Sequence, residues 1–365
     1  MSDFRDLLNY ARNITNDTLA EVFDEVMYEA ESINDKLVAL PYISKDYTLR
    51  GGKRLRAFLI MIGYWSKEWR HKDLDKLRYL MAGIEFLQSY FLVHDDIMDK
   101  DELRRGGPTV HVWFEKKCIE EKLLGDCKHY GISQAILAGD YLETLAVSSF
   151  YRLGLPSNII EELLRRYTKG LRTVSYGQYL DLLIAYTPLE KVSEEDIYNI
   201  HKLKTASYTV ELPLHLGAIA STLYTPKLLE ELSSYAIPAG IAFQLQDDIL
   251  GLYGDPKITG KPVGSDVREK KKTLLIVKAY ELGSEREKRF LEKIYNEKKS
   301  EEITINDIEE VRRIVRETGS YDYSMKKMQN YVNEAKTALL ESEEICPKAK
   351  EVLSWLVDLF VKRVK

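Results

Sequence analysis

The spacing of its apolar residues restricts the fold of this chain more than any other feature. Leu80, Ile84, Leu87 and Phe91 recur at intervals of four, three and four residues, which places them on one face of an α-helix. Helical spacing of this kind dominates the sequence, and the alternation typical of β-strands is hard to find. We therefore expect an all-α fold.

The length of 365 residues would allow two domains. However, no Pro/Gly/Ser-rich linker and no low-complexity segment divides the chain. Hydrophobic residues make up 45% of the composition, which is enough for a large core. We therefore expect a single domain over residues 1–365.

Charge, hydropathy and cysteine content narrow the range of partners and compartments. A net charge of −5 gives no electrostatic reason to expect nucleic-acid binding. No window has 18 uninterrupted apolar residues, and the N-terminus lacks the basic-then-apolar order of a signal peptide, so we expect no membrane span. Three cysteines without C-x-x-C spacing argue against a disulfide framework. These features predict a soluble protein of the cytoplasm, where the environment is reducing.

An acidic cluster, Asp95-Asp96-Ile97-Met98-Asp99, follows an apolar run. If residues 84–99 form one helix, Asp95 and Asp99 lie one turn apart on the same face, where the carboxylates repel each other and the helix dipole opposes both. A magnesium ion would relieve this repulsion, since it takes oxygen ligands and often reaches substrate phosphates through one or two carboxylates. A second acidic pair, Asp247-Asp248, follows another apolar run. We interpret the two clusters as two sides of one metal and phosphate cavity.

Basic residues accompany the acidic clusters. Gly51-Gly52-Lys53-Arg54-Leu55-Arg56 precedes an apolar helical segment, and both glycines and a helix N-terminus favour a bound anion. Arg104-Arg105 follows the first acidic cluster closely enough to bridge metal-bound phosphate oxygens. Each motif alone could be an ordinary helix start or a surface ion pair. Their order along the chain carries more information than either motif.

That order resembles one family. The motifs are Gly-Gly-Lys-x-x-Arg, Asp-Asp-x-x-Asp, Arg-Arg-Gly, Gly-Gln-x-x-Asp-Leu, Lys-Thr-Ala, Gln-x-x-Asp-Asp, and Gly-Lys-Pro with a later Lys-Lys-Thr. Between about Gly51 and Thr273 the chain resembles the trans-prenyl diphosphate synthases of the farnesyl and geranylgeranyl type. The resemblance implies one all-α domain, a helical bundle around a deep central cavity, and a homodimer. It also implies that isopentenyl diphosphate is condensed head-to-tail with an allylic diphosphate.

The resemblance implies roles for individual residues. The isopentenyl diphosphate site would comprise Lys53, Arg56, Gln88 and Arg105. The allylic diphosphate would be bound by Arg104, Lys204, Thr205, Gln244, Lys261 and Lys271, with support from Gln178 and Asp181. Three magnesium ions would be shared by Asp95, Asp99 and Asp247. The catalytic set would be Asp95, Asp96, Asp99, Arg104, Lys204, Thr205, Gln244, Asp247 and Asp248.

The implied chemistry needs no protein nucleophile. Magnesium and cationic side chains neutralise the charge that grows on the departing diphosphate. The double bond of isopentenyl diphosphate attacks the allylic carbocation, and loss of a proton completes the new carbon–carbon bond. A dry helical cavity would keep out the water that quenches this cation.

Three departures from the family pattern bear on the site. Gly251 stands where a third aspartate of the second acidic motif is common. Lys270 stands where glycine is frequent, which leaves the register of the following lysines open. Residues 116–130 are extra relative to the family pattern, and we expect a surface loop or a short helix there.

Tyr90 and Phe91 bear on product length. They precede Asp95 by five and four residues, so large rings there would form a floor under the growing chain. A farnesyl (C15) product is favoured, with geranylgeranyl (C20) next, although such a ring pair is also ordinary core packing.

Three other functions are compatible with parts of the pattern. A class I terpene cyclase would leave Lys53 and Arg56 without a role. A di-iron carboxylate bundle would need Glu-x-x-His on two helices. A non-catalytic prenyl synthase subunit is supported only by Gly251.

Overall fold

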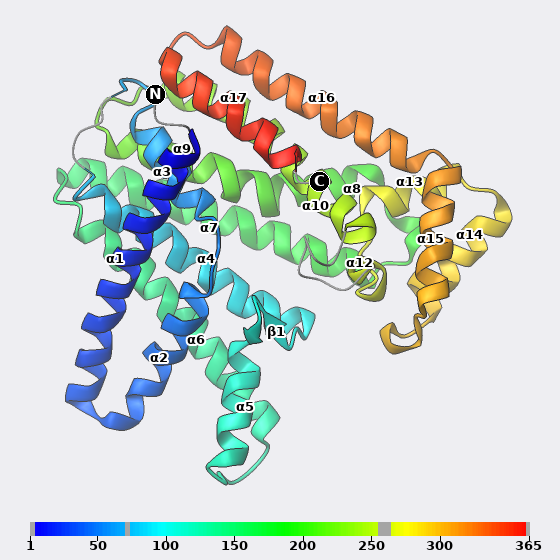
Figure 1. Ribbon diagram of the computed structural model, residues 1–365, viewed down its shortest axis with the longest axis horizontal. Coiled ribbons are helices and arrows are strands. Elements are labelled where there is room, and N and C mark those ends of the chain that lie inside the picture. Colours follow the sequence, from blue (N-terminus) through cyan, green and yellow to red (C-terminus); the bar gives the residue numbers. More distant parts are fainter. Residues whose placement is uncertain (1–3, 70–73, 255–263, 363–365) are drawn as a thin grey trace. The chain divides into compact units, whose positions relative to one another are not determined.

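The computed structural model describes residues 4–69, 74–254 and 264–362 (Figure 1). The chain divides into two compact units. Unit 1 comprises residues 1–64, 70–164 and 219–222, and unit 2 comprises residues 65–69, 165–218 and 223–365. We describe each unit by itself. The all-α prediction is confirmed, since the strands in the described residues are limited to one two-stranded hairpin.

Unit 1 is built around a long central helix. Its elements are α1 (Phe4–Ile33), η1 (Asp35–Val38), α2 (Ala39–Leu49), α3 (Leu55–Tyr64), α4 (Leu77–Asp99), β1 (Leu103–Arg104), β2 (Gly107–Pro108), α5 (Val110–Glu120), α6 (Cys127–Tyr151) and the start of α7 (Ser157–Tyr186). The predicted helix over residues 84–99 is the C-terminal part of α4, and Leu80, Ile84 and Leu87 are buried as their spacing predicts. Helix α4 packs mainly against α6, and α1 and α3 also contact it.

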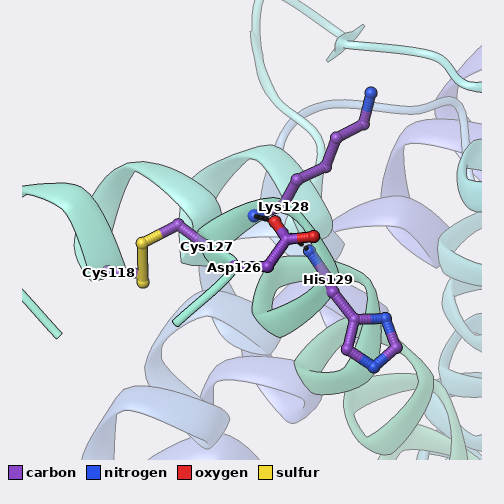
Figure 2. Close-up of a disulfide and its surroundings, with 5 residues drawn as sticks. All are labelled: Cys118, Asp126, Cys127, Lys128 and His129. Carbon is purple, nitrogen blue, oxygen red and sulfur yellow. Dashed lines mark hydrogen bonds between the residues drawn. A yellow bond between two sulfur atoms is a disulfide. The ribbon is translucent and has the colours of Figure 1, made fainter. Parts of the chain in front are cut away.

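The α5–α6 hairpin corrects two expectations. Residues 116–130, expected to be a surface loop or a short helix, are the end of α5, a tight connection and the start of α6. Cys118 and Cys127 form a disulfide across this connection, with their Cα atoms 5.5 Å apart (Figure 2). Asp126 caps α6 by accepting hydrogen bonds from the backbone N–H groups of Lys128 and His129 (Figure 2). The prediction of no disulfide is wrong because two antiparallel helices bring together cysteines nine positions apart.

Unit 2 surrounds another long helix, α10. Besides the rest of α7, its elements are η2 (Leu189–Lys191), α8 (Glu194–Ile200), the π-helix η3 (His201–Glu211), α9 (Leu212–Ala220), α10 (Pro226–Tyr253), α12 (Ser265–Arg268), α13 (Leu274–Leu282), α14 (Glu285–Glu292), η4 (Lys293–Glu297), η5 (Ser300–Glu302), α15 (Ile305–Glu317), α16 (Ser320–Glu341) and α17 (Pro347–Val361). Helix α10 packs against η3, α16 and α17. A Cβ atom at Gly240 would overlap Ala206, so α10 and η3 approach each other at backbone distance.

Among the described residues, none of the helices combines the length and the apolar content needed to span a bilayer. Helix η3 is unusual in another respect, because its π-helical turns are wider than those of an α-helix. Such segments are frequent at functional sites. This one carries Lys204 and Thr205, two of the predicted site residues.

Candidate active site

The first acidic cluster lies at the C-terminal end of α4, where the helix dipole is negative. Asp95 is half-buried and Asp99 is exposed, so both carboxylates of the predicted metal pair reach solvent. Asp96 between them is buried. The three aspartates therefore differ in environment although they are neighbours in sequence.

Asp96 connects three elements of unit 1. It accepts a hydrogen bond of 2.6 Å from the hydroxyl of Tyr47 on α2 and another from Nε of Arg104 on β1. Arg104 also pairs with Asp101 at 3.0 Å. Burial raises the pKa of Asp96 to about 6, and Arg104 and Tyr47 oppose this rise. Asp96 therefore holds the guanidinium of Arg104 in place.

The glycine-rich loop and the β1–β2 hairpin contact each other. Gly51 and Gly52 have φ angles of 66° and 106°, which favour glycine. Arg105 donates hydrogen bonds to the backbone carbonyls of Arg50 and Gly51 at 3.3 and 3.1 Å. The structure thus brings one predicted isopentenyl diphosphate residue, Arg105, to the loop that leads into α3.

The other residues predicted for the isopentenyl diphosphate are also in unit 1. Lys53 is exposed just before α3, and Arg56 is half-buried in its first turn. Gln88 is half-buried on α4, two turns before Asp95. The positions of Lys53 and Arg56 beside a helix N-terminus suit a bound anion.

The second acidic pair lies near the end of α10, and its two residues also differ. Asp247 is exposed and Asp248 is buried. One oxygen of Asp248 accepts hydrogen bonds from Gln244 at 3.0 Å and Lys271 at 2.9 Å, and the other is 3.0 Å from Nε2 of His201. Burial would raise the pKa of Asp248, but Lys271 and His201 outweigh it and hold the pKa well below its usual range.

Predicted allylic residues of α7, η3 and α10 also contact one another. Lys204 pairs with Asp181 at 2.7 Å, and the hydroxyl of Thr205 donates to Gln244 at 2.8 Å. Gln178 is half-buried one turn before Asp181. A Cβ atom at position 177 would overlap the backbone at Lys204, so the glycine lets α7 approach η3 closely.

Two of the lysines after Arg268 have different partners. Lys271 donates a hydrogen bond of 2.9 Å to Asp248. Lys272 instead donates to the carbonyls of Ile184 and Ala185 at the end of α7, and burial lowers its pKa to about 8. Lys261 lies outside the described residues.

The aromatic pair before Asp95 is half-buried. The rings of Tyr90 and Phe91 lie 4.9 Å apart, and Tyr90 packs edge-on against His94 at 4.8 Å. His94 in turn approaches the Ile136 carbonyl on α6. Burial raises the pKa of Tyr90, and Asp140 on α6 adds to the rise. Tyr90 is therefore on the side of α4 that faces α6.

The carboxylates fit magnesium better than a metal held by protein ligands alone. In the parts of the chain that the structure describes, no three His, Cys, Asp or Glu side chains are grouped closely enough to hold a metal. Mg²⁺ commonly uses one or two carboxylates and takes its other ligands from water and substrate phosphates. Within unit 1, Asp95 is half-buried and Asp99 is exposed, and within unit 2, Asp247 is exposed, so each unit offers a carboxylate that solvent reaches.

Sequence reasoning missed two residues that support the site. Tyr47 anchors Asp96, and His201 anchors Asp248. Neither contact has a local sequence signal, because each joins residues more than 40 positions apart.

Comparisons with known proteins identify the family of this chain. The model of the family described as polyprenyl synthetase matches residues 39–314. Geranylfarnesyl diphosphate synthase from Aeropyrum pernix is 33% identical, with 86% of this chain and 91% of that protein covered. Geranylgeranyl diphosphate synthase from Sulfolobus acidocaldarius is 32% identical, with 94% and 98% covered.

A solved structure shares the fold. Geranylgeranyl pyrophosphate synthase from Corynebacterium glutamicum, complexed with isoprenyl diphosphate and magnesium, matches with a TM-score of 0.89 at 28% identity, covering 98% of this chain and 99% of that one. The fold and the matches thus define an isoprenoid synthase. The chain belongs to the polyprenyl synthetase family and is a chain-elongating prenyltransferase of the prenyl diphosphate synthase type.

Proposed function

We propose that this protein condenses isopentenyl diphosphate with an allylic diphosphate, dimethylallyl or geranyl, in a magnesium-dependent reaction. One observation carries the proposal. Each acidic pair has an accessible aspartate followed by a buried one, and the buried one holds a cation predicted to bind diphosphate. Asp96 holds Arg104, and Asp248 holds Lys271.

The proposed roles of the individual residues are as follows. Asp95, Asp99 and Asp247 would hold magnesium, which supplies charge neutralisation when bound. Arg104, Lys204 and Lys271 would bind the allylic diphosphate and favour its departure. Thr205 and Gln244, already joined by a hydrogen bond, would line the allylic side, and Gln178 and Asp181 would support it. The isopentenyl diphosphate would be bound by Lys53, Arg56, Gln88 and Arg105.

We favour a C20 product. The relative from Sulfolobus acidocaldarius and another from Saccharolobus solfataricus, 30% identical over 96% of this chain, are both called geranylgeranyl diphosphate synthase. The ring pair Tyr90 and Phe91 keeps C15 as the second candidate. Further proposals that rest on the sequence are three magnesium ions per site, one functional domain and a homodimer. A cytoplasmic location is also proposed, although the Cys118–Cys127 disulfide argues against a reducing environment. An exposed stripe of Tyr176, Tyr179, Leu183 and Tyr186 on α7 supports self-association.

Product analysis tests the proposal. Purified protein should be incubated with magnesium, isopentenyl diphosphate and each allylic primer in turn, with Asp95→Ala as the control. We expect linear prenyl diphosphates ending at C20 and no elongation without isopentenyl diphosphate. A cyclic hydrocarbon formed from the allylic diphosphate alone would instead establish a terpene cyclase, and no turnover with any primer would favour a non-catalytic subunit.

A further inference from the structure

The contact between η3 and α10 is organised by two polar pairs. His201 and Thr205 are one turn apart on η3, and their partners Asp248 and Gln244 are one turn apart on α10. Gln244 also donates to Asp248, so the two pairs are joined on the α10 side. The close approach of Gly240 to Ala206 holds the two helix backbones together beyond these pairs.

His201 is the first residue of η3 and has no role in the predicted site. Its side chain is 4% exposed, and the carboxylate of Asp248 is 1% exposed. Nε2 of His201 lies 3.0 Å from Oδ2 of Asp248, where an N–H group of the ring donates to the carboxylate oxygen. Nδ1 is buried without a hydrogen-bond partner among the described residues. A buried ring nitrogen without a hydrogen-bond partner costs stability. The polar contact that His201 makes is therefore the one from Nε2 to Asp248.

The contact bears on the site because the two oxygens of Asp248 have different partners. His201 binds Oδ2, while Gln244 and Lys271 bind Oδ1. Without His201, the carboxylate could rotate about its side-chain bonds, and Lys271 and Gln244 would lose a fixed acceptor. The hydroxyl of Thr205 would also lose a fixed partner, since it donates to Gln244. Three residues proposed for the allylic side therefore depend on one carboxylate orientation.

We propose that His201 is a positioning residue for the allylic diphosphate side, acting through Asp248. It sets the carboxylate so that Lys271 and Gln244 present a fixed arrangement to the allylic diphosphate. The inference rests on the proposed function, since it assumes that these residues face that substrate.

A matched amide pair tests this role. In His201→Gln the amide nitrogen can reach Asp248, whereas the shorter side chain of His201→Asn cannot. His215 provides the control, because it is equally buried in unit 2 and its Nε2–H donates to the Leu229 carbonyl rather than to a site residue. The measurements are the Michaelis constant for each substrate, kcat, the thermal midpoint, and the calorimetric affinity for pyrophosphate with magnesium.

We expect His201→Asn to lower kcat/KM for the allylic diphosphate about tenfold to a hundredfold and to weaken pyrophosphate binding. The Michaelis constant for isopentenyl diphosphate should not change, His201→Gln should recover most of the loss, and His215→Asn should lower only the thermal midpoint. Equal behaviour of His201→Gln and His201→Asn, or the same kinetic profile in His215→Asn, would overturn the inference. A wild-type protein that binds pyrophosphate but forms no prenyl product would instead overturn the proposed function, because binding is measured without turnover.

Discussion

Neighbouring aspartates do different work in each acidic pair. Asp95 and Asp247 are accessible and suit a metal, whereas Asp96 and Asp248 are buried and hold other side chains in place. The physical cause is helix geometry, since consecutive residues point about 100° apart around the axis. Gly251 lies in the second acidic motif, and the nearby carboxylate of Asp266 leaves no room for a side chain at this position.

Restoring the common family motif should harm the protein. In Gly251→Asp, the new Cβ would overlap the carboxylate of Asp266, and two carboxylates would be forced together. We expect a loss of stability of about 2 to 4 kcal/mol and lower turnover. Urea unfolding and steady-state kinetics measure this, with Gly251→Ala as the control, since it adds the Cβ at the same place without a second carboxylate. Unchanged stability with raised activity in Gly251→Asp would contradict the packing argument.

Alanine substitutions should separate the two aspartates of the second pair. Asp247→Ala removes an exposed metal ligand, so turnover should be abolished with little change in unfolding free energy. Asp248→Ala removes a buried acceptor of three hydrogen bonds, so stability should fall by about 2 to 4 kcal/mol in addition to the loss of turnover. Chemical denaturation of both variants measures the two unfolding free energies. Equal unfolding free energies would show that the burial of Asp248 has no energetic consequence.

At the scale of elements, polar side chains fix the ends of helices to one another. Glu194, the first residue of α8, accepts hydrogen bonds from Tyr323 on α16 at 2.7 and 2.9 Å and from Lys278 on α13 at 3.1 Å. Lys327 on α16 pairs with the same carboxylate at 3.3 Å. One carboxylate therefore ties three helices of unit 2 together.

The stability that the Glu194 carboxylate contributes should depend on pH. Burial opposes ionisation of Glu194, but the hydrogen bonds from Tyr323 and Lys278 outweigh it and lower its pKa to about 2. The contribution to stability is therefore complete above the unfolded pKa of 4.5 and is lost as pH falls through about 2. Glu194→Gln should cost about 1 to 3 kcal/mol at pH 7, and the difference from wild type should shrink below pH 4.5. Urea midpoints across this range test it, and a difference that stays constant down to pH 2.5 would be evidence against the assignment.

The disulfide between Cys118 and Cys127 should stabilise the pair of helices α5 and α6. Closing the short loop between α5 and α6 should stabilise the hairpin by about 2 to 3 kcal/mol relative to the reduced chain. Cys118→Ser with Cys127→Ser should therefore increase hydrogen exchange in α5 and the start of α6, and Cys346→Ser serves as the control since its thiol is free. Turnover should stay unchanged, because neither cysteine is near a predicted site residue in sequence. Unaltered exchange in the hairpin would contradict a stabilising role.

At the scale of the whole molecule, folding and ligand binding should be linked. A ligand that binds only the folded state stabilises it by about 2.7 kcal/mol at 100 times its Kd. Pyrophosphate with magnesium should therefore raise the thermal midpoint, and EDTA should abolish both the rise and turnover. Asp247→Ala should show a smaller rise than wild type. A full rise in the presence of EDTA would mean that pyrophosphate binds without metal.

The sequence by itself determined the fold class, the family and the two acidic motifs. These follow from local rules, since helical spacing buries one face of α4 and motif order needs no knowledge of contacts. Tertiary structure decided the rest. Which aspartate is buried, which lysine reaches Asp248, the pairing of Cys118 with Cys127 and the contact of His201 all depend on residues that only packing brings together. Sequence spacing carries no information on such contacts, because burial and close approach are set by neighbouring helices.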